Sequence, residues 1–189
     1  MAPVGRLTID QYRELRKNDP KQSAVLICMY PLNKSVYTAL ILRPPEQGVH
    51  SDQVSFPGGA FEDADQSLEQ TALREVSEEI GIDPFTVELL GRLTPVYIPV
   101  SNYLVQPVVG FMMNQPKFNL NKSEVRRIIE ADCGEFLNEV NKGKHFFKSG
   151  MGIEIEAPYY EIQQQKIWGA TAMILSELEV ILRELDFPS

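Results

Sequence analysis

Three glutamates between residues 74 and 80 have the type and spacing of a metal-binding surface. Each residue of an α-helix turns by about 100°, so Glu75, Glu78 and Glu79 share an arc of about 100° on one side of the helix. Carboxylates this close repel one another unless a cation lies between them. A hard divalent cation such as Mg²⁺ prefers these oxygen ligands, and Arg74 can pair with the carboxylate of Glu78 one turn later.

The segment before this helix favours a site over a merely solvated helix face. A glycine-rich turn follows an apolar run, and Gly58 and Gly59 let the backbone approach a ligand or metal closely. Ser67 is the expected N-cap, with Gln70 as its capping-box partner, and Gly81 is the expected C-cap. The sequence therefore predicts a strand, a glycine turn and an acidic helix, in that order.

Residues 59–82 resemble the Nudix box, G-x5-E-x7-R-E-U-x-E-E-x-G-U, in which U is a bulky apolar residue. The second half matches at every specified position: Arg74, Glu75, Val76, Glu78, Glu79, Gly81 and Ile82. In the first half Asp65 stands where the pattern has Glu, one residue further from the helix arginine. The resemblance implies the Nudix fold and a hydrolase that cleaves a diphosphate linked to another moiety, with Mg²⁺ or Mn²⁺.

This resemblance gives the motif residues their expected roles. Glu75 and Glu79 are the expected direct metal ligands, and Glu78 is the third ligand or the partner of a second ion. The glycine turn orients the start of the helix and offers a backbone carbonyl, which adds Gly59 to the metal set. Metal ions held there bridge the diphosphate oxygens and lower the pKa of a bound water.

A second signature, L-L-T-x-R-S-x3-R-x3-G-x3-F-P-G-G, belongs to the coenzyme A pyrophosphatase branch of the Nudix family, which this chain resembles. The chain fits it at Leu40, Arg43, Phe56, Pro57, Gly58 and Gly59, and departs from it at Ala39, Ile41, Pro44, Gly48 and Asp52. The resemblance implies hydrolysis of coenzyme A or acyl-coenzyme A to adenosine 3′,5′-bisphosphate and 4′-phosphopantetheine or its acyl derivative.

Two other functions stay open. The first is a Nudix hydrolase of another nucleoside diphosphate derivative, such as ADP-ribose, NADH or a nucleoside triphosphate. The second is a non-catalytic, nucleotide-sensing Nudix domain. Sensors of that kind normally lack one or more metal carboxylates, so the intact Glu75, Glu78 and Glu79 count against the second alternative.

Residues outside the box supply candidates for the remaining roles. Glu124 is a candidate general base, because family members often draw that group from another segment. Arg43 ends a strand and His50 lies in the loop before the glycine turn, so both are candidates for substrate binding, together with Gly58 and Gly59. Each of the three side chains also has a plainer interpretation as a surface residue. Acidic residues 62, 63 and 65 either support the site or are simply solvated.

Composition restricts the class of protein. A chain of 189 residues that is 43% hydrophobic can bury the core of one ordinary domain. The net charge of −8 argues against a nucleic-acid-binding surface. Two cysteines in unrelated segments indicate free thiols in a reducing compartment, and no apolar run reaches the length of a membrane span. We therefore expect a cytoplasmic protein without a membrane or nucleic-acid partner. The resemblance adds a homodimer as an expectation.

The expected architecture is α+β: an α/β/α sandwich with a mixed β-sheet between helices. We expect a helical N-terminal extension over residues 1–22 and a Nudix hydrolase domain over residues 23–189. Expected strands cover residues 23–30, 36–43, 86–95 and 103–112, with a connection at 96–102. Residues 124–129 suit a strand or a helix, 131–140 look helical, 152–162 look like a hairpin around Ala157-Pro158, and 169–185 have helical spacing.

Overall fold

The computed structural model describes residues 19–45, 53–148 and 154–188. The helix expected within residues 1–18 lies outside these ranges, so the division into an extension and a domain stays a prediction. In the described part of the chain, no helix is long and apolar enough to span a bilayer.

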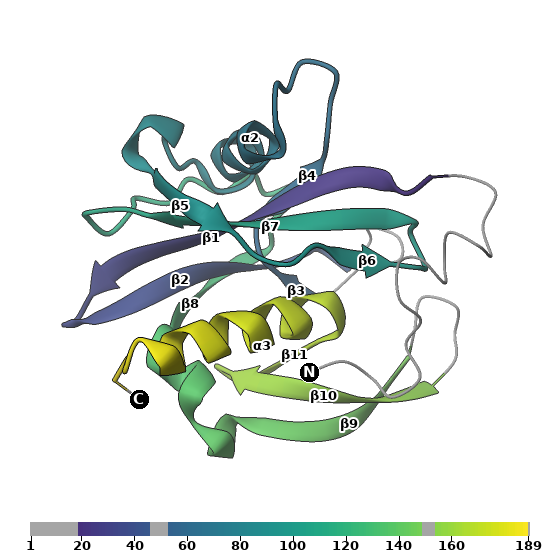
Figure 1. Ribbon diagram of the computed structural model, residues 1–189, viewed down its shortest axis with the longest axis vertical. Helices are drawn as coiled ribbons and strands as arrows, with labels where there is room; N and C mark the ends of the chain where they lie inside the picture. Colours follow the sequence, from purple (N-terminus) through teal and green to yellow (C-terminus); the bar gives the residue numbers. More distant parts are fainter. Residues whose placement is uncertain (1–18, 46–52, 149–153, 189) are drawn as a thin grey trace.

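A large mixed sheet forms the centre of the molecule, with α2 on one face and α3 on the other (Figure 1). Its main path runs β3-β2-β1-β7-β5, while β4 pairs with β1, β6 with β7 and β8 with β2. The strands are β1 (Lys21–Leu32), β2 (Ser35–Leu42), β3 (Val54–Ser55), β4 (Gly58–Ala60), β5 (Glu88–Arg92), β6 (Val96–Ile98), β7 (Tyr103–Phe111) and β8 (Arg127–Asp132). The helices are α2 (Leu68–Ile80) and α3 (Gly169–Glu184). This arrangement confirms the expected α+β class with helices on both sides of a mixed sheet.

The sheet is mixed because its central pair, β1 and β7, is parallel, while its other pairs are antiparallel. The expected hairpin of β1 and β2 is confirmed, with Asn33 and Lys34 at its tip at φ values of 50° and 66°. Positive φ at both positions matches the twist of a two-residue hairpin. β1 begins two residues earlier than expected, because Lys21 is already paired with Tyr103 of β7.

Side chains alternate along β1 and divide the interior into two cores. Leu26 and Cys28 join the core beneath α2, whereas Ile27 joins the core beneath α3. From α2, the buried residues Ala72, Val76 and Ile80 enter the first core. From α3, the buried residues Ala172, Ile174, Leu175, Leu178 and Leu182 enter the second. The central sheet thus fixes α2 through its apolar face and leaves its acidic face available.

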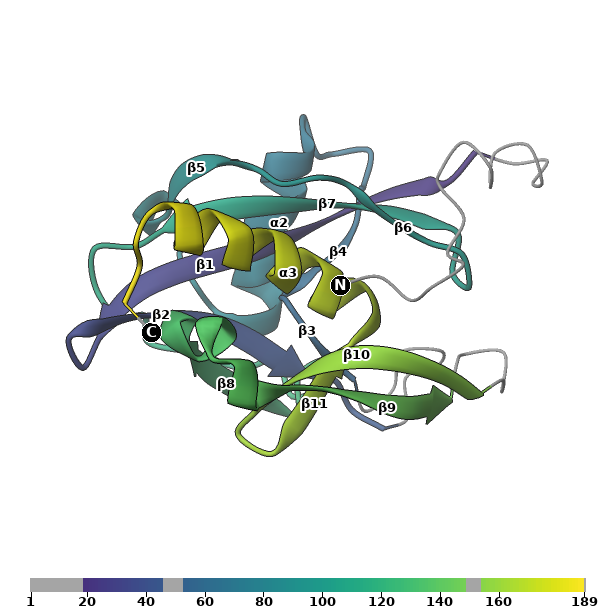
Figure 2. The same cartoon turned by 60° about the horizontal axis from the view of Figure 1, so that its bottom comes forward.

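A second, three-stranded sheet lies beside α3 (Figure 2). It has the order β11-β10-β9 and consists of β9 (Lys142–Lys148), β10 (Glu154–Ile162) and β11 (Gln165–Trp168). The hairpin expected around Ala157-Pro158 is wrong, because β10 runs straight through both residues. A proline is compatible with extended backbone, and the turn lies instead at residues 163–164, where both glutamines have positive φ.

The segment after β7 also differs from expectation. The helix expected over residues 131–140 is wrong: Ala131 pairs with Thr38 in the sheet, and β8 continues to Asp132. Two short 3₁₀ turns follow, η3 (Cys133–Leu137) and η4 (Glu139–Asn141). Another such turn, η2 (Pro84–Thr86), precedes β5, so that strand is shorter than expected, while the connection at 96–102 contains the short strand β6.

Candidate active site

The acidic helix α2 begins and ends where the sequence predicts. The Ser67 hydroxyl accepts a hydrogen bond from the Gln70 backbone N–H at 3.3 Å. The Gln70 side chain accepts from the Gln66 N–H at 2.9 Å instead of closing the expected box on Ser67. At the other end Gly81 is left-handed, with φ of 73°, and its N–H bonds to the Ser77 carbonyl at 3.0 Å. These caps fix the rotation of the helix that presents the glutamates.

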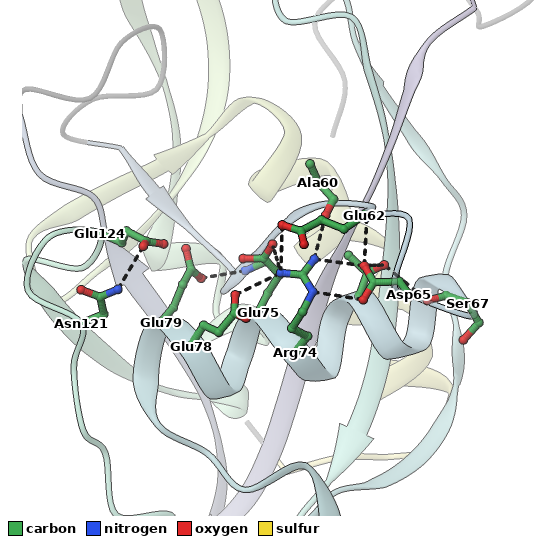
Figure 3. A network of polar contacts seen from close by, with 12 residues as sticks. Ala60, Glu62, Asp65, Ser67, Arg74, Glu75, Glu78, Glu79, Asn121 and Glu124 are labelled. Atoms are coloured by element: carbon green, nitrogen blue, oxygen red, sulfur yellow. Dashed lines mark hydrogen bonds and ion pairs between the residues drawn. The ribbon is translucent and has the colours of Figure 1, made fainter.

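Arg74 is the hub of the polar network on this helix (Figure 3). Its Nη1 donates to Glu75 Oε1 at 2.9 Å and to Glu78 Oε2 at 3.0 Å. Its Nε and Nη2 bind the two carboxylate oxygens of Asp65, both at 3.0 Å, and Nη2 also donates to the Ala60 carbonyl at 2.9 Å. The pair with Glu78 expected from the sequence is therefore present within a larger set that ties the loop to the helix.

Asp65 is a buried anchor and not a solvated loop acid. Its carboxylate accepts from the Thr71 hydroxyl at 2.9 Å and from the Glu62 N–H at 3.0 Å, in addition to the fork from Arg74. These bonds, led by those from Arg74, lower the pKa of Asp65 to about 2. Asp63 is exposed, as a solvated acid would be. The departure from the box pattern thus keeps a carboxylate on the helix arginine.

Glu79 is the most buried carboxylate of the helix, with 1% of its surface exposed. Its Oε2 accepts from the Gly58 N–H at 2.8 Å, and its Oε1 lies 3.2 Å from Arg43 Nη2, which also donates to the Gly58 carbonyl at 3.0 Å. Burial raises the pKa of Glu79 to about 7, against the opposing effects of Arg43 and Gly58 and with help from the charges of Glu75 and Glu124.

Glu75 lies directly against β4. Gly58 and Gly59, which the sequence placed in a turn, are strand residues there and pair with Val25 and Ala24 of β1. A Cβ atom at Gly59 would overlap the Glu75 carboxylate, so the glycine leaves room for this carboxylate beside β4. Burial raises the pKa of Glu75, Arg74 opposes this effect, and the charges of Glu78 and Glu124 add to it. Mutual repulsion among these carboxylates is the electrostatic property that a bound cation would relieve.

Glu124 is brought to the helix by the segment before β8. The Asn119 N–H donates to the Ile80 carbonyl and the Asn121 N–H to the Glu79 carbonyl, both at 2.9 Å. Glu124 Oε1 accepts from Asn121 Nδ2 at 3.0 Å, and its carboxylate faces the side of α2 that carries Glu79 (Figure 3). The candidate general base thus lies at the site, whereas His50 lies outside the residues that the structure describes.

Oxygen-only donors and their repulsion fit a hard divalent cation in chemical type. Within the three described ranges, no three acidic, histidine or cysteine side chains are already arranged as a metal cluster. Glu75 and Glu78 are paired with Arg74, and Glu79 with Arg43. The three glutamates therefore suit a divalent cation once their carboxylates exchange an arginine partner for the metal ion.

Several of these contacts could not be read from the sequence. The pair of Arg43 with Glu79 joins the end of β2 to α2, and the fork from Arg74 to Asp65 depends on the path of an irregular loop. Asn121 offered a local signal, because an Asn two residues before a Ser is typical of an Asx turn. Its Oδ1 accepts from the Ser123 N–H at 3.2 Å and from the Ser123 hydroxyl at 2.6 Å.

Comparison with known proteins agrees with this geometry. Residues 20–130 match the family model of the NUDIX domain. The chain is 35% identical over 165 residues to the uncharacterized Nudix hydrolase NudL of Pectobacterium atrosepticum, covering 84% of this chain and 81% of that protein. It is 34% identical over 165 residues to Nudix hydrolase 15, mitochondrial, of Arabidopsis thaliana, covering 82% of this chain and 56% of that protein.

A mixed sheet between helices that holds two glycines against an acidic helix is the arrangement that the Nudix box predicts. The chain belongs to the Nudix hydrolase family, whose members generally use divalent metal ions. The fold is also that of the NUDIX domain of Shewanella oneidensis NrtR, solved with ADP ribose, at a TM-score of 0.57 and 14% identity over 93% of this chain and 99% of that one.

Proposed function

We propose that this Nudix hydrolase cleaves the diphosphate of coenzyme A or acyl-coenzyme A, with Mg²⁺ or Mn²⁺. The products are adenosine 3′,5′-bisphosphate and 4′-phosphopantetheine or its acyl derivative. One observation carries the proposal: Arg43 and Gly58, two residues of the second signature, both contact the buried carboxylate of Glu79. These contacts of two signature residues with the acidic helix support the proposal.

In this proposal Glu75, Glu78 and Glu79 hold the cation, together with the backbone carbonyl of Gly59. When bound, the cation screens the diphosphate charge and acidifies a water molecule. Arg74 orients Glu75 and Glu78 through its hydrogen bonds to both.

The other site residues act on the substrate and on the attacking water. Glu124 takes the proton of the water that attacks phosphorus, and the P–O bond to the other half of the diphosphate breaks as the new one forms. Arg43, His50, Gly58 and Gly59 bind the substrate. Support for these roles comes from the charge of Glu124, which helps to raise the pKa of Glu79, and from the hydrogen bond that Arg43 donates to the Gly58 carbonyl.

We propose a cytoplasmic enzyme with a small nucleotide substrate and without a nucleic-acid partner, supported by a net charge of −8. Homodimerisation is proposed on the family resemblance.

A substrate panel tests the proposal. Purified protein with millimolar Mg²⁺ or Mn²⁺ is given coenzyme A, ADP-ribose, NADH and a nucleoside triphosphate, and products are separated by chromatography. Release of adenosine 3′,5′-bisphosphate from coenzyme A at the highest kcat/KM is expected. Preferred cleavage of another compound would reject the substrate and retain the chemistry, and nucleotide binding without any cleavage would favour a sensor.

Glu79→Gln tests the site. The amide keeps an acceptor for the Gly58 N–H but loses the charge, so we expect kcat to fall by about a thousandfold, as is typical when charge stabilisation of the transition state is removed. Glu184→Gln is the matched control, because Glu184 is exposed at the end of α3, and its kcat should stay at the wild-type value. Wild-type kcat in Glu79→Gln would show that the carboxylate assignment is wrong.

A further inference from the structure

Arg43 supplies the positive charge that the buried carboxylate of Glu79 requires. Glu79 is 1% exposed, and its Oε1 has Arg43 Nη2 at 3.2 Å. An ionised carboxylate at this depth is unfavourable unless a positive group pairs with it. A divalent cation bound to Glu79 would also neutralise this carboxylate, so a guanidinium and a metal ion would compete for the same negative charge.

The two arginines of the site are held differently. Arg74 is fixed by the fork from Asp65 and by the Ala60 carbonyl, whether or not it contacts the helix glutamates. For Arg43, the part of the chain that the structure describes provides one carboxylate, Glu79, and one further acceptor, the Gly58 carbonyl. Its side chain is 22% exposed. Arg43 can therefore leave its carboxylate, whereas Arg74 is anchored.

We propose that Arg43 is a releasable counter-ion, which holds Glu79 in the cation-free protein and moves to a phosphate oxygen of the substrate when a divalent cation binds Glu79. The proposal rests on the metal role of Glu79 in the proposed function. A guanidinium is a bidentate partner for phosphate as it is for carboxylate. Cation and diphosphate then bind cooperatively, because each favours the released position of Arg43.

Mn²⁺ affinity of the substrate-free protein distinguishes a competitor from a positioning group. In Arg43→Gln the competitor is gone, so Mn²⁺ should bind about tenfold more tightly, equivalent to about 1.4 kcal/mol. Free Mn²⁺ is measured by EPR in oxygen-free buffer, at the same pH for the wild type and every variant. Arg127→Gln is the matched control, because it removes the same charge from an exposed residue. Arg127 lies opposite Leu42 in the pairing of β8 with β2 and does not contact Glu79.

Unchanged or weaker Mn²⁺ binding in Arg43→Gln, relative to Arg127→Gln, would overturn the proposal. If Arg43→Gln does not fold, Arg43→Lys takes its place. Lysine lacks the planar fork of arginine and binds Glu79 less firmly, so the affinity of this variant for Mn²⁺ should exceed that of the wild type. An equal or lower affinity would overturn the proposal. In the wild type, methylenediphosphonate, a non-hydrolysable diphosphate, should increase the affinity for Mn²⁺. This increase should be lost in both Arg43 variants.

Glu79→Gln separates this failure from that of the proposed function. If it leaves Mn²⁺ affinity unchanged, the metal assignment itself is wrong. If it weakens Mn²⁺ binding while the Arg43 variants do not strengthen it, only the release of Arg43 is wrong.

Discussion

At the scale of single residues, Arg74 and Asp65 convert an irregular loop into a rigid support for the acidic helix. The guanidinium uses Nε and Nη2 on Asp65 and Nη1 on Glu75 and Glu78. Its planar fork makes these bonds from one fixed geometry. A shift of Asp65 would therefore displace two proposed metal ligands at once.

Asp65→Asn removes the charge that holds Arg74. Because the Asp65 side chain is 5% exposed, breaking this pair should lower the free energy of unfolding by about 3 kcal/mol. We also expect lower kcat, since Glu75 and Glu78 lose their orientation. Asp63→Asn is the control, because Asp63 is an exposed acid of the same loop. Urea unfolding and kcat, measured on both variants, check the prediction; equal values for the two variants would contradict it.

At the scale of elements, the contact of β4 with α2 decides the shape of the site. In Gly59→Ala the new Cβ would overlap the Glu75 carboxylate, and the side chain must move. We expect kcat to fall by about a hundredfold or more, since small displacements in a site have effects of that size. Glu184→Ala is the control, because Glu184 is exposed at the end of α3, on the other face of the sheet from α2. Full activity in Gly59→Ala would mean that Glu75 is not a ligand.

The elements differ in how well the sequence predicts them. Helix α2 is predicted closely, because its apolar stripe, the Ser67 cap and the Gly81 cap are all local signals. The continuous β10 is not, because Pro158 resembles a turn residue although it lies within the strand. The helix expected near Ala131 fails for another reason: long-range strand pairing with Thr38 overrides local spacing.

The contacts of the site also divide into those that local sequence patterns predict and those that they do not. The helix periodicity places Glu75, Glu78 and Glu79 together, and the structure agrees. The contacts of Arg43 and Asp65 come from chain paths that no local pattern encodes. Their partners are a neighbouring element or an irregular loop, so only the folded chain reveals them.

At the scale of the whole molecule, the two cores place a cluster of acids where the sheet, α2 and the segment at 119–124 meet. The chain carries a net charge of −8, and the site adds a local negative field in which Glu79 is almost fully buried. Ionisation of Glu79 therefore lowers the free energy of unfolding, and a cation bound to Glu79 raises it.

The stability of the metal-free protein should consequently fall as pH rises. The pKa of Glu79 is raised from 4.5 to about 7 in the fold. Below about pH 4.5 Glu79 is protonated in the folded and the unfolded chain and does not change the free energy of unfolding. Between about pH 4.5 and pH 7 only the unfolded chain ionises, so the free energy of unfolding falls as pH rises. Above about pH 7 the loss is complete. Urea unfolding in EDTA at about pH 5 and about pH 8 should show a loss in wild type that exceeds the loss in Glu79→Gln by on the order of 2 kcal/mol. Millimolar Mg²⁺ at the higher pH should restore part of the wild-type stability and little of the variant's. The same pH dependence in both proteins would mean that Glu79 is not the group that couples folding of this molecule to its proton and its metal.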